Sequence, residues 1–267
     1  MSAAPSDAAG RSAVGVAPRA AATEVSLIPG VRHGNGKAVV SFRYGTTLTL
    51  TPDTANPLFG HAVTFTAAVA PANAVAGTPG GSVSFSDGTR TLATVPVSDG
   101  LARFSTAGLQ PGSHTVTAHY SGDAEFTPSD PPAPAEMSVG FSGPCLTAEH
   151  HGALTVAAGE SVCIGSGGAQ TGPVVVQQGG ALAVSDARIT GPLTADGALA
   201  VTLCRSQLAG PVTVNGTSGH VLIGGTADGT DGCGGNAITG PLRCAGNEPA
   251  PFLSGNTVKG PRFGQCG

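Results

Sequence analysis

The stretch TGPVVVQQGGALAVSDARITGPLTADGALAVTLCRSQLAGPVTV, residues 171–214, carries the pattern that decides the fold of the second half of the chain. A Gly-Pro dipeptide opens each unit, a β-branched or apolar run follows, and a glycine turn leads into a second apolar run. Gly-Pro followed by Val or Leu occurs at residues 172, 191, 210 and 240, with a degenerate fifth Gly-Pro at residue 260, which gives spacings of 19, 19, 30 and 20. The long spacing is one period plus an insertion in GGTADGTDGCGG, residues 224–235. Repetition near every 20 residues without helical periodicity predicts a β-solenoid whose stacked coils share one core.

The cysteines lie only in this repetitive half of the chain. An even number without any C-x-x-C pair predicts disulfides rather than a zinc ribbon or a thioredoxin-type site. Cys204 and Cys233 precede successive Gly-Pro steps by six and seven residues, so stacking would bring them close together. The same comparison of coil positions favours one connectivity of the fifteen that six cysteines allow. The predicted pairs are Cys145–Cys163, Cys204–Cys233 and Cys244–Cys266.

The first half shows the alternation of a half-buried sheet. Val63, Phe65 and Ala67, for example, alternate with threonine and alanine. The dipeptides Asp87-Gly88 and Asp99-Gly100 predict tight hairpin turns with positive φ at both central residues, and this turn chemistry accounts for both aspartates. About six or seven short strands in a hundred residues predict an immunoglobulin-like sandwich.

Two parts of the sequence also resemble known families. The runs HAVTFTAAVAP (61–71) and GGSVSFSDGTRTLATVPVSDGLARFSTAGLQPGSHTVTAHYSGDAEFTPS (80–129) resemble the bacterial Ig-like domain of secreted and cell-surface proteins, with its elements in family order. This resemblance implies a rod-like spacer or adhesion module without catalysis of its own. The units VQQGGALAV (176–184), GGNAITG (234–240) and SGNTVKG (254–260) resemble the small β-solenoid tails of bacterial secreted proteins, which implies architecture only.

The sequence therefore predicts an all-β chain, with a β-sandwich followed by a short β-solenoid of parallel β-helix type. Residues 1–23, rich in Ala, Gly, Ser and Pro, are predicted to be disordered, and residues 24–45 form a lead-in with a hairpin or an extra strand. The Ig-like sandwich is expected at residues 46–141. The disulfide-containing solenoid is expected at residues 142–267.

Composition narrows the function classes. The 42 glycines and 21 prolines among 267 residues argue against a helical protein. A net charge of -4 with only 10% charged residues offers no basic surface for nucleic acid. No stretch approaches the roughly 18 apolar residues of a membrane helix. The cysteines favour secretion, but residues 1–22 lack the apolar core of a signal peptide, so we expect the natural start to lie upstream or the signal to be absent from this chain.

The densest titratable cluster is Glu149-His150-His151. It lacks the helical spacing of a zinc protease motif, so we interpret it as a polar cap before the first coil. The other histidines are scattered: His33, His61, His114, His119 and His220. Alternation predicts that His119 points away from the sandwich core and that His114 is a hydrogen-bonded structural residue on the inner face.

The acidic and polar residues of the second half also lack the pattern of a functional site. Asp228 and Asp231 lack the ordered ligand series of a calcium loop. Asp186 and Asp196 occupy different phases of neighbouring coils, which does not favour a glycosidase pair. The remaining motifs have structural interpretations: a stacked ladder of Asn236 and Asn256, and a Gly-rich turn at Ser166. We therefore predict no catalytic, cofactor-binding or metal-binding residue.

These observations favour a non-catalytic secreted or cell-surface protein with a structural or adhesive role. The alternative is a carbohydrate-binding accessory module for cell-wall or extracellular polysaccharide, for which the second half supplies only Phe252 and Phe263, with Phe141 at the junction. A polysaccharide-acting β-helix enzyme is the third hypothesis. Possible partners are a polysaccharide or another surface protein.

Overall fold

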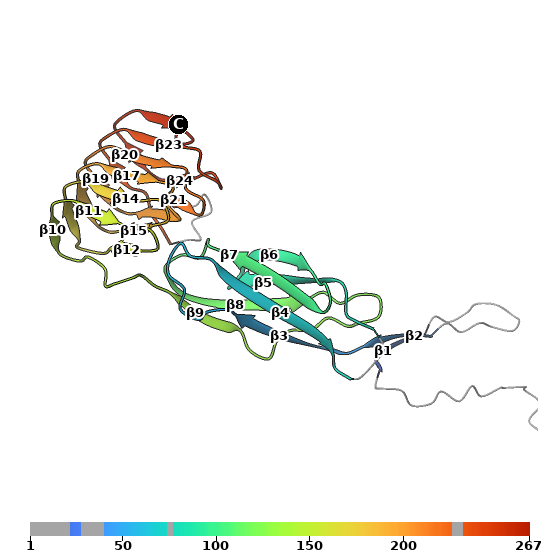
Figure 1. Cartoon of the computed structure of the whole chain (residues 1–267). Helices are drawn as coiled ribbons and strands as arrows, with labels where there is room; N and C mark the ends of the chain where they lie inside the picture. Colours follow the sequence, from blue (N-terminus) through green and yellow to red (C-terminus); the bar gives the residue numbers. More distant parts are fainter. Residues whose placement is uncertain (1–21, 28–39, 74–76, 226–231) are drawn as a thin grey trace, which may run out of the picture.

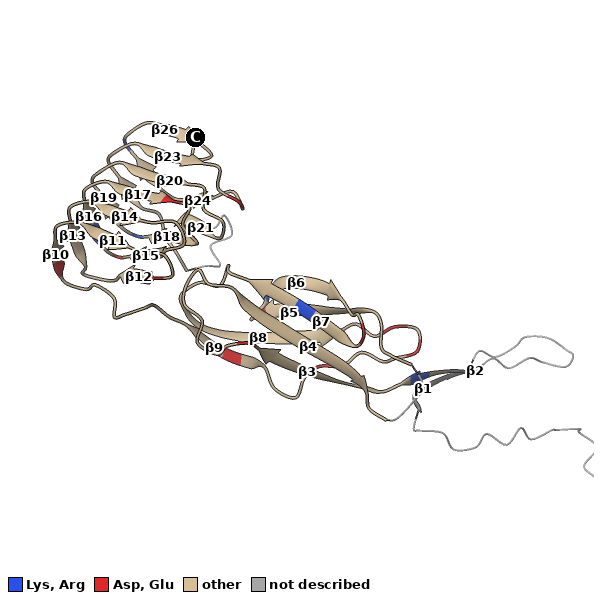
Figure 2. Cartoon of the chain, in the orientation of Figure 1, with Lys and Arg blue, Asp and Glu red and all other residues tan. Residues whose placement is uncertain are grey.

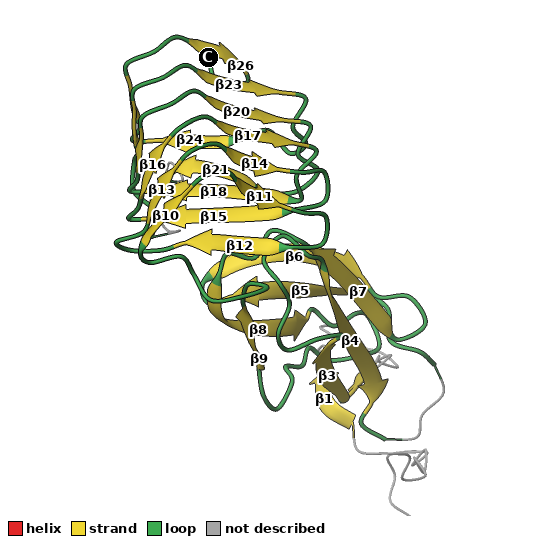
Figure 3. Cartoon of the chain, turned by 60° about the vertical axis from the view of Figure 1, so that its left-hand side comes forward, coloured by secondary structure: helices red, strands yellow, loops and turns green. Residues whose placement is uncertain are grey.

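The computed structural model describes residues 22–27, 40–73, 77–225 and 232–267. Strands and turns make up this part of the chain, with no helix among the described residues, so the all-β prediction is confirmed (Figure 3). A sandwich of antiparallel sheets is followed by a solenoid of about six coils (Figure 1). The predicted disorder of residues 1–23 falls almost wholly outside the described residues.

The lead-in forms an antiparallel pair of strands, β1 (Ala22–Leu27) and β2 (Val40–Tyr44). This two-stranded ribbon lies at the end of the sandwich remote from the solenoid (Figure 1). Its last residue joins it to the sandwich, because the Tyr44 amide donates to the Glu125 carbonyl oxygen (2.7 Å) and the Tyr44 ring packs against Phe126.

Seven strands build the sandwich in two sheets. One sheet has the order β3-β4-β7 and the other β6-β5-β8-β9, with all neighbours antiparallel. The alternating residues close on one core, in which the buried rings of Phe65 and Phe85 pack against each other and against the half-buried ring of Phe104. The strands are β3 (Thr46–Pro52), β4 (Val63–Pro71), β5 (Ser82–Asp87), β6 (Arg90–Pro96), β7 (Leu101–Thr106), β8 (Gly112–Tyr120) and β9 (Ala135–Val139).

The two predicted Asp-Gly turns differ. Asp99 (φ 51°) and Gly100 (φ 75°) are the central residues of a two-residue turn, as predicted. The other prediction is wrong by one residue, because Asp87 pairs with Arg90 and the central residues are Gly88 and Thr89. Gly88 has the positive φ of this turn, and Asp87 does not. Asp87 is therefore the last residue of β5, and its carboxylate is available for another contact.

The solenoid consists of three parallel sheets, each built from one strand of every coil that reaches it (Figure 3). The β10 sheet contains β10 (Glu149–His151), β13 (Ala169–Thr171), β16 (Arg188–Thr190), β19 (Gln207–Leu208), β22 (Ala237–Ile238) and β25 (Thr257–Val258). The β11 sheet contains β11 (Leu154–Val156), β14 (Val174–Val176), β17 (Leu193–Asp196), β20 (Val212–Asn215), β23 (Leu242–Ala245) and β26 (Arg262–Gly264). The β12 sheet contains β12 (Ser161–Ile164), β15 (Ala181–Ser185), β18 (Ala200–Cys204), β21 (Val221–Gly224) and β24 (Phe252–Ser254).

The Gly-Pro step is the corner between the β10 sheet and the β11 sheet. Its glycines stack so closely that a Cβ on Gly210 would lie 2.2 Å from the Gly191 carbonyl oxygen. Gly152 occupies the same corner of the first coil, beneath Gly172, although alanine rather than proline follows it. Because this corner lacks the proline, the Gly-Pro repeat does not mark the first coil.

Buried amides bridge successive coils at the other corners. The predicted asparagine ladder is confirmed: Asn236 Nδ2 donates to Asn256 Oδ1 (2.9 Å), and the Ser206 amide donates to Asn236 Oδ1 (2.9 Å). A second ladder was not predicted, in which Asn247 Nδ2 donates to Gln265 Oε1 (3.0 Å). The second position of this ladder holds glutamine instead of asparagine, so the sequence shows no repeated residue that would predict it.

Candidate functional site

The junction between the sandwich and the solenoid is the most elaborate site in the described part of the chain. The first strands of the β12 sheet are buried on both faces: Leu182 and Leu203 face the coil core, whereas Ala181 and Ala200 face outward and are also fully buried. The sandwich covers this outer face. Small outward residues are needed, because alanine allows the neighbouring domain to approach the sheet closely.

The closest approach is at residues 59–60 of the sandwich. Ser161 Oγ on β12 donates a buried hydrogen bond to the Phe59 carbonyl oxygen (2.7 Å). Gly60 has φ +81°, and a Cβ there would lie only 2.8 Å from the Ala181 Cβ atom. Glycine is therefore required both by the backbone conformation and by the contact.

A second sandwich loop reaches the same sheet. Thr202 Oγ1 on β18 donates to Gln110 Oε1 (3.1 Å). His114 fixes this loop, because its Nε2 donates to the Gln110 carbonyl oxygen (2.6 Å) while Nδ1 lies 2.7 Å from Asp87 Oδ2. The prediction of a hydrogen-bonded His114 is confirmed. The view that turn chemistry alone accounts for Asp87 is wrong, since its carboxylate orients this histidine.

A cavity of about 320 Å³ lies beside the second of these contacts. Its sandwich wall includes Pro111 and Phe141, and its solenoid floor includes Ala183 and Thr202. Both Cys145–Cys163 and Cys204–Cys233 contribute to its lining. The lining is mostly apolar, and Arg205 is its one charged residue among those described.

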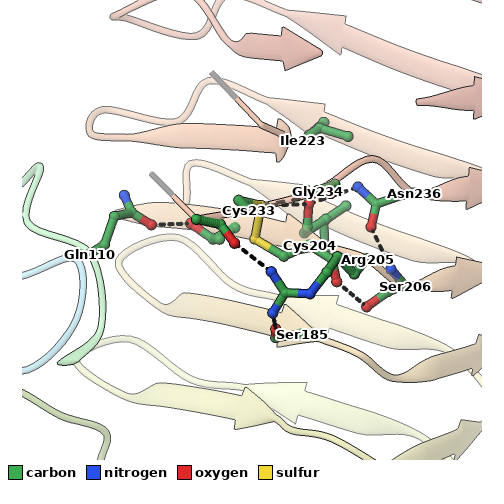
Figure 4. The surroundings of a disulfide bond; sticks show 12 residues. Gln110, Ser185, Cys204, Arg205, Ser206, Ile223, Cys233, Gly234 and Asn236 are labelled. Carbon is green, nitrogen blue, oxygen red and sulfur yellow. Dashed lines mark hydrogen bonds between the residues drawn. A yellow bond between two sulfur atoms is a disulfide. The ribbon is translucent and has the colours of Figure 1, made fainter. Parts of the chain in front are cut away.

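Arg205 is held in place beside the Cys204–Cys233 disulfide (Figure 4). Its Nε and Nη2 atoms donate to the two carboxylate oxygens of Asp186 at 2.8 and 2.7 Å, and Nη1 donates to the Gly232 carbonyl oxygen. The hydrogen bonds from Arg205, with one from Ser185, lower the pKa of Asp186 to about 2, and the hydrogen bonds to Asp186 raise the pKa of Arg205. The arginine charge is thus already balanced at the edge of the cavity.

The structure forms three disulfides, and they are the pairs that the coil positions predicted. Cys145–Cys163 ties the segment after the sandwich to the first coil, Cys204–Cys233 ties β18 to the end of the insertion, and Cys244–Cys266 joins the last two coils. Cys244 and Cys266 are fully buried in the solenoid core. The cystines therefore brace the beginning, middle and end of the stack.

The Glu149-His150-His151 cluster is not a cap before the first coil. It forms β10, the first strand of that coil, and His150 shares the inward column with Gln170. His150 Nδ1 lies 2.7 Å from Gln170 Oε1, and Gln170 Nε2 donates to the Gly152 carbonyl oxygen. The predicted position of the cluster is therefore wrong. The hydrogen bond with Gln170 explains why a histidine is tolerated in this inward column.

Other candidates are dispersed in the described residues. Asp196 accepts a hydrogen bond from Asn215 Nδ2, at a different corner from Asp186, and Ser166 lies in a turn as predicted. His119 is exposed as predicted, near Asp130, and the His220 ring stacks on Phe252. Predictions on His33, Asp228 and Asp231 lie outside the described residues. Within those described, no three His, Cys, Asp or Glu side chains gather as metal ligands would.

In the described part of the chain, the charged residues are scattered and do not gather in one segment of a single sign (Figure 2). Phe252 and Phe263 are both exposed but belong to different sheets, β24 and β26. Phe141 is packed against Phe59 at the junction. The three phenylalanines therefore do not form one row on the surface.

Comparison with known proteins bears on the sandwich. The family model of the bacterial Ig-like domain (group 3) matches residues 48–140, which run from β3 to the end of β9. This segment is a bacterial Ig-like domain, a family that suggests a surface or structural module. The domain and the disulfides are consistent with an extracellular location. No curated protein and no solved structure matches the chain. None of the described residues form a helix able to cross a membrane.

Proposed function

We propose that the chain is a non-catalytic structural or adhesion module of a secreted or cell-surface bacterial protein. In this proposal the Ig-like domain is the spacer, and the solenoid is the element held away from the attachment point. The disulfides support export, because such bonds persist in oxidising compartments.

The observation that carries this proposal is the continuous packing across the junction. Ala181, Ala183 and Ala200 of the solenoid belong to the same buried cluster as the sandwich core. The Ser161 and Thr202 hydrogen bonds fix two separate points of that contact. A spacer fixes the orientation of its far end only when its parts do not pivot, and two anchored points oppose pivoting.

The non-catalytic part of the proposal rests on the placement of the carboxylates. Asp186 is paired with Arg205 at one corner, whereas Asp196 contacts Asn215 at another. Acid and base catalysis on a glycoside needs two carboxyl groups facing one substrate. These two do not share a surface.

Adhesion can be tested with beads that carry the full chain attached through either its N-terminus or its C-terminus. We expect N-terminal attachment to give at least about fivefold more adherence to cells of the producing bacterium than bare beads, because it leaves the solenoid outermost. C-terminal attachment serves as the control for orientation. Equal, background-level adherence in both orientations would remove adhesion from the proposal and leave a spacer.

The carbohydrate-binding alternative has weaker support. Sugar-binding surfaces commonly use aromatic rings in a row, and Phe252 and Phe263 lie on different sheets. A glycan array probed with the full chain separates the two hypotheses. Saturable binding to one polysaccharide class would favour the accessory module, whereas its absence is expected for a structural protein.

A further inference from the structure

The junction cavity, defined by Gln110, Pro111, Phe141, Ala183, Thr202 and the two neighbouring disulfides, has no role in the spacer proposal. Its volume of about 320 Å³ falls within the range of small-molecule sites, and such sites occur preferentially between domains. We propose that this cavity binds an uncharged, ring-bearing organic molecule of about two fused rings.

The cavity is a consequence of how the two domains are held apart. Residues 59–60 contact the outward column of Ala181 and Ala200, and the Gln110 loop contacts Thr202. Beside the Gln110–Thr202 contact the outward residues of β15 are Ala183 and Ser185, which are too short to fill the space. The hydrogen bond between Gln110 and Thr202 holds the sandwich wall in place, so the cavity does not close on that side unless this contact breaks.

The charge of the lining selects an uncharged ligand. Arg205 already forms a two-point ion pair with Asp186 and also donates to the Gly232 carbonyl oxygen. An anion would have to compete with Asp186, and the described lining offers no carboxylate for a cation. Because burial of an unpaired charge is strongly unfavourable, a neutral molecule fits best.

The chemistry of the walls favours a ring with one polar group. The Phe141 ring and the sulfur atoms of two disulfides give a polarisable apolar surface, on which aromatic rings pack well. Thr202 and Gln110 supply hydroxyl and amide groups at one side of the cavity. A hydroxyl or carbonyl group on the ligand can hydrogen-bond there.

The test is a titration of the isotope-labelled full chain with 2-naphthol, followed by nuclear magnetic resonance, with 2-naphthoate as the charged counterpart. We expect 2-naphthol to saturate with a dissociation constant of about 0.1–1 mM. The shifts should centre on Gln110, Ala183 and Thr202. 2-Naphthoate should bind at least tenfold more weakly.

Two variants identify the site. Ala183→Phe fills the cavity and should weaken 2-naphthol binding at least tenfold, whereas Ala237→Phe, the same change on an exposed outward position of β22, should alter it less than twofold. Ser185→Leu provides a milder obstruction if Ala183→Phe does not fold. The proposal is overturned if 2-naphthol does not saturate, if the shifts centre on Phe252 or Phe263, if 2-naphthoate binds equally well, or if folded cavity variants bind like the unaltered chain.

Discussion

Substitution of Gly210 by alanine isolates the contact that sets the period of the solenoid. Gly210 does not have a left-handed φ, so alanine introduces no backbone strain of its own. Its Cβ would lie 2.2 Å from the Gly191 carbonyl oxygen and 2.4 Å from the Gly191 carbonyl carbon. An ordinary contact needs more than 3 Å, so the two coils would have to separate locally by about 1 Å.

The expected loss of stability follows from the bonds near that corner. The Ala209 amide donates to the Ile189 carbonyl oxygen and the Leu193 amide to the Pro211 carbonyl oxygen, both at 2.9 Å, and both bonds join the two coils that would separate. Weakening two such bonds at about 1 kcal/mol each, with the cost of disturbed packing, gives about 3 kcal/mol.

The assay is urea unfolding of the oxidised chain followed by far-ultraviolet circular dichroism, with calorimetry to separate the solenoid from the sandwich. Gly143→Ala is the matched control, because a Cβ there meets nothing within 4 Å and its φ is also not left-handed. We expect the control to lie within about 0.5 kcal/mol of the unaltered chain. If Gly210→Ala were equally mild, the close stacking of glycines would not be what fixes the coil period.

Four further perturbations address other parts of the stack. Replacing Cys244 and Cys266 together by alanine should cost about 3 kcal/mol, since their bond closes 22 residues, and a calorimetric midpoint unchanged from that of the oxidised chain would argue against the brace. Asn236→Ala should cost about 2 kcal/mol and increase amide hydrogen exchange at Ser206, whereas no increase would argue against the ladder. Because the folded pKa of Asp186 is about 2, below its ordinary value of 3.8, its ion pair should stabilise the chain above pH 4 and lose that effect as the pH falls towards 2. Arg205→Ala should move the Asp186 carboxyl titration back towards 3.8 by carbon-13 resonance, and an unmoved titration would refute the assigned cause.

The repeat made the solenoid predictable from sequence. Each Gly-Pro corner needs a residue without a side chain, so the steric requirement is written directly in the residue type. The cysteine pairs were predictable for the same reason, because the distance of each cysteine from the nearest Gly-Pro step gives its position within its coil. The sandwich was predictable from alternation, because one face of each strand is buried.

The candidate site was not predictable in the same way. The junction brings together Gly60, Gln110 and Ala183, which are far apart in sequence and ordinary in type. Nothing local distinguishes an outward alanine that meets another domain from one that meets solvent. Asp87 is an example from within the sandwich. The sequence Asp-Gly-Thr allows a turn centred on Asp-Gly or on Gly-Thr, and only the register of the two strands decides between them.

The central claim is that the sandwich and the solenoid form one rigid unit. Nitrogen-15 relaxation of the backbone amides measures it most directly, by comparing β4 in the sandwich with β15 in the solenoid. We predict one common rotational correlation time for both strands, set by the size of the whole chain. Two different correlation times, each appropriate to a separate smaller domain, would contradict the account.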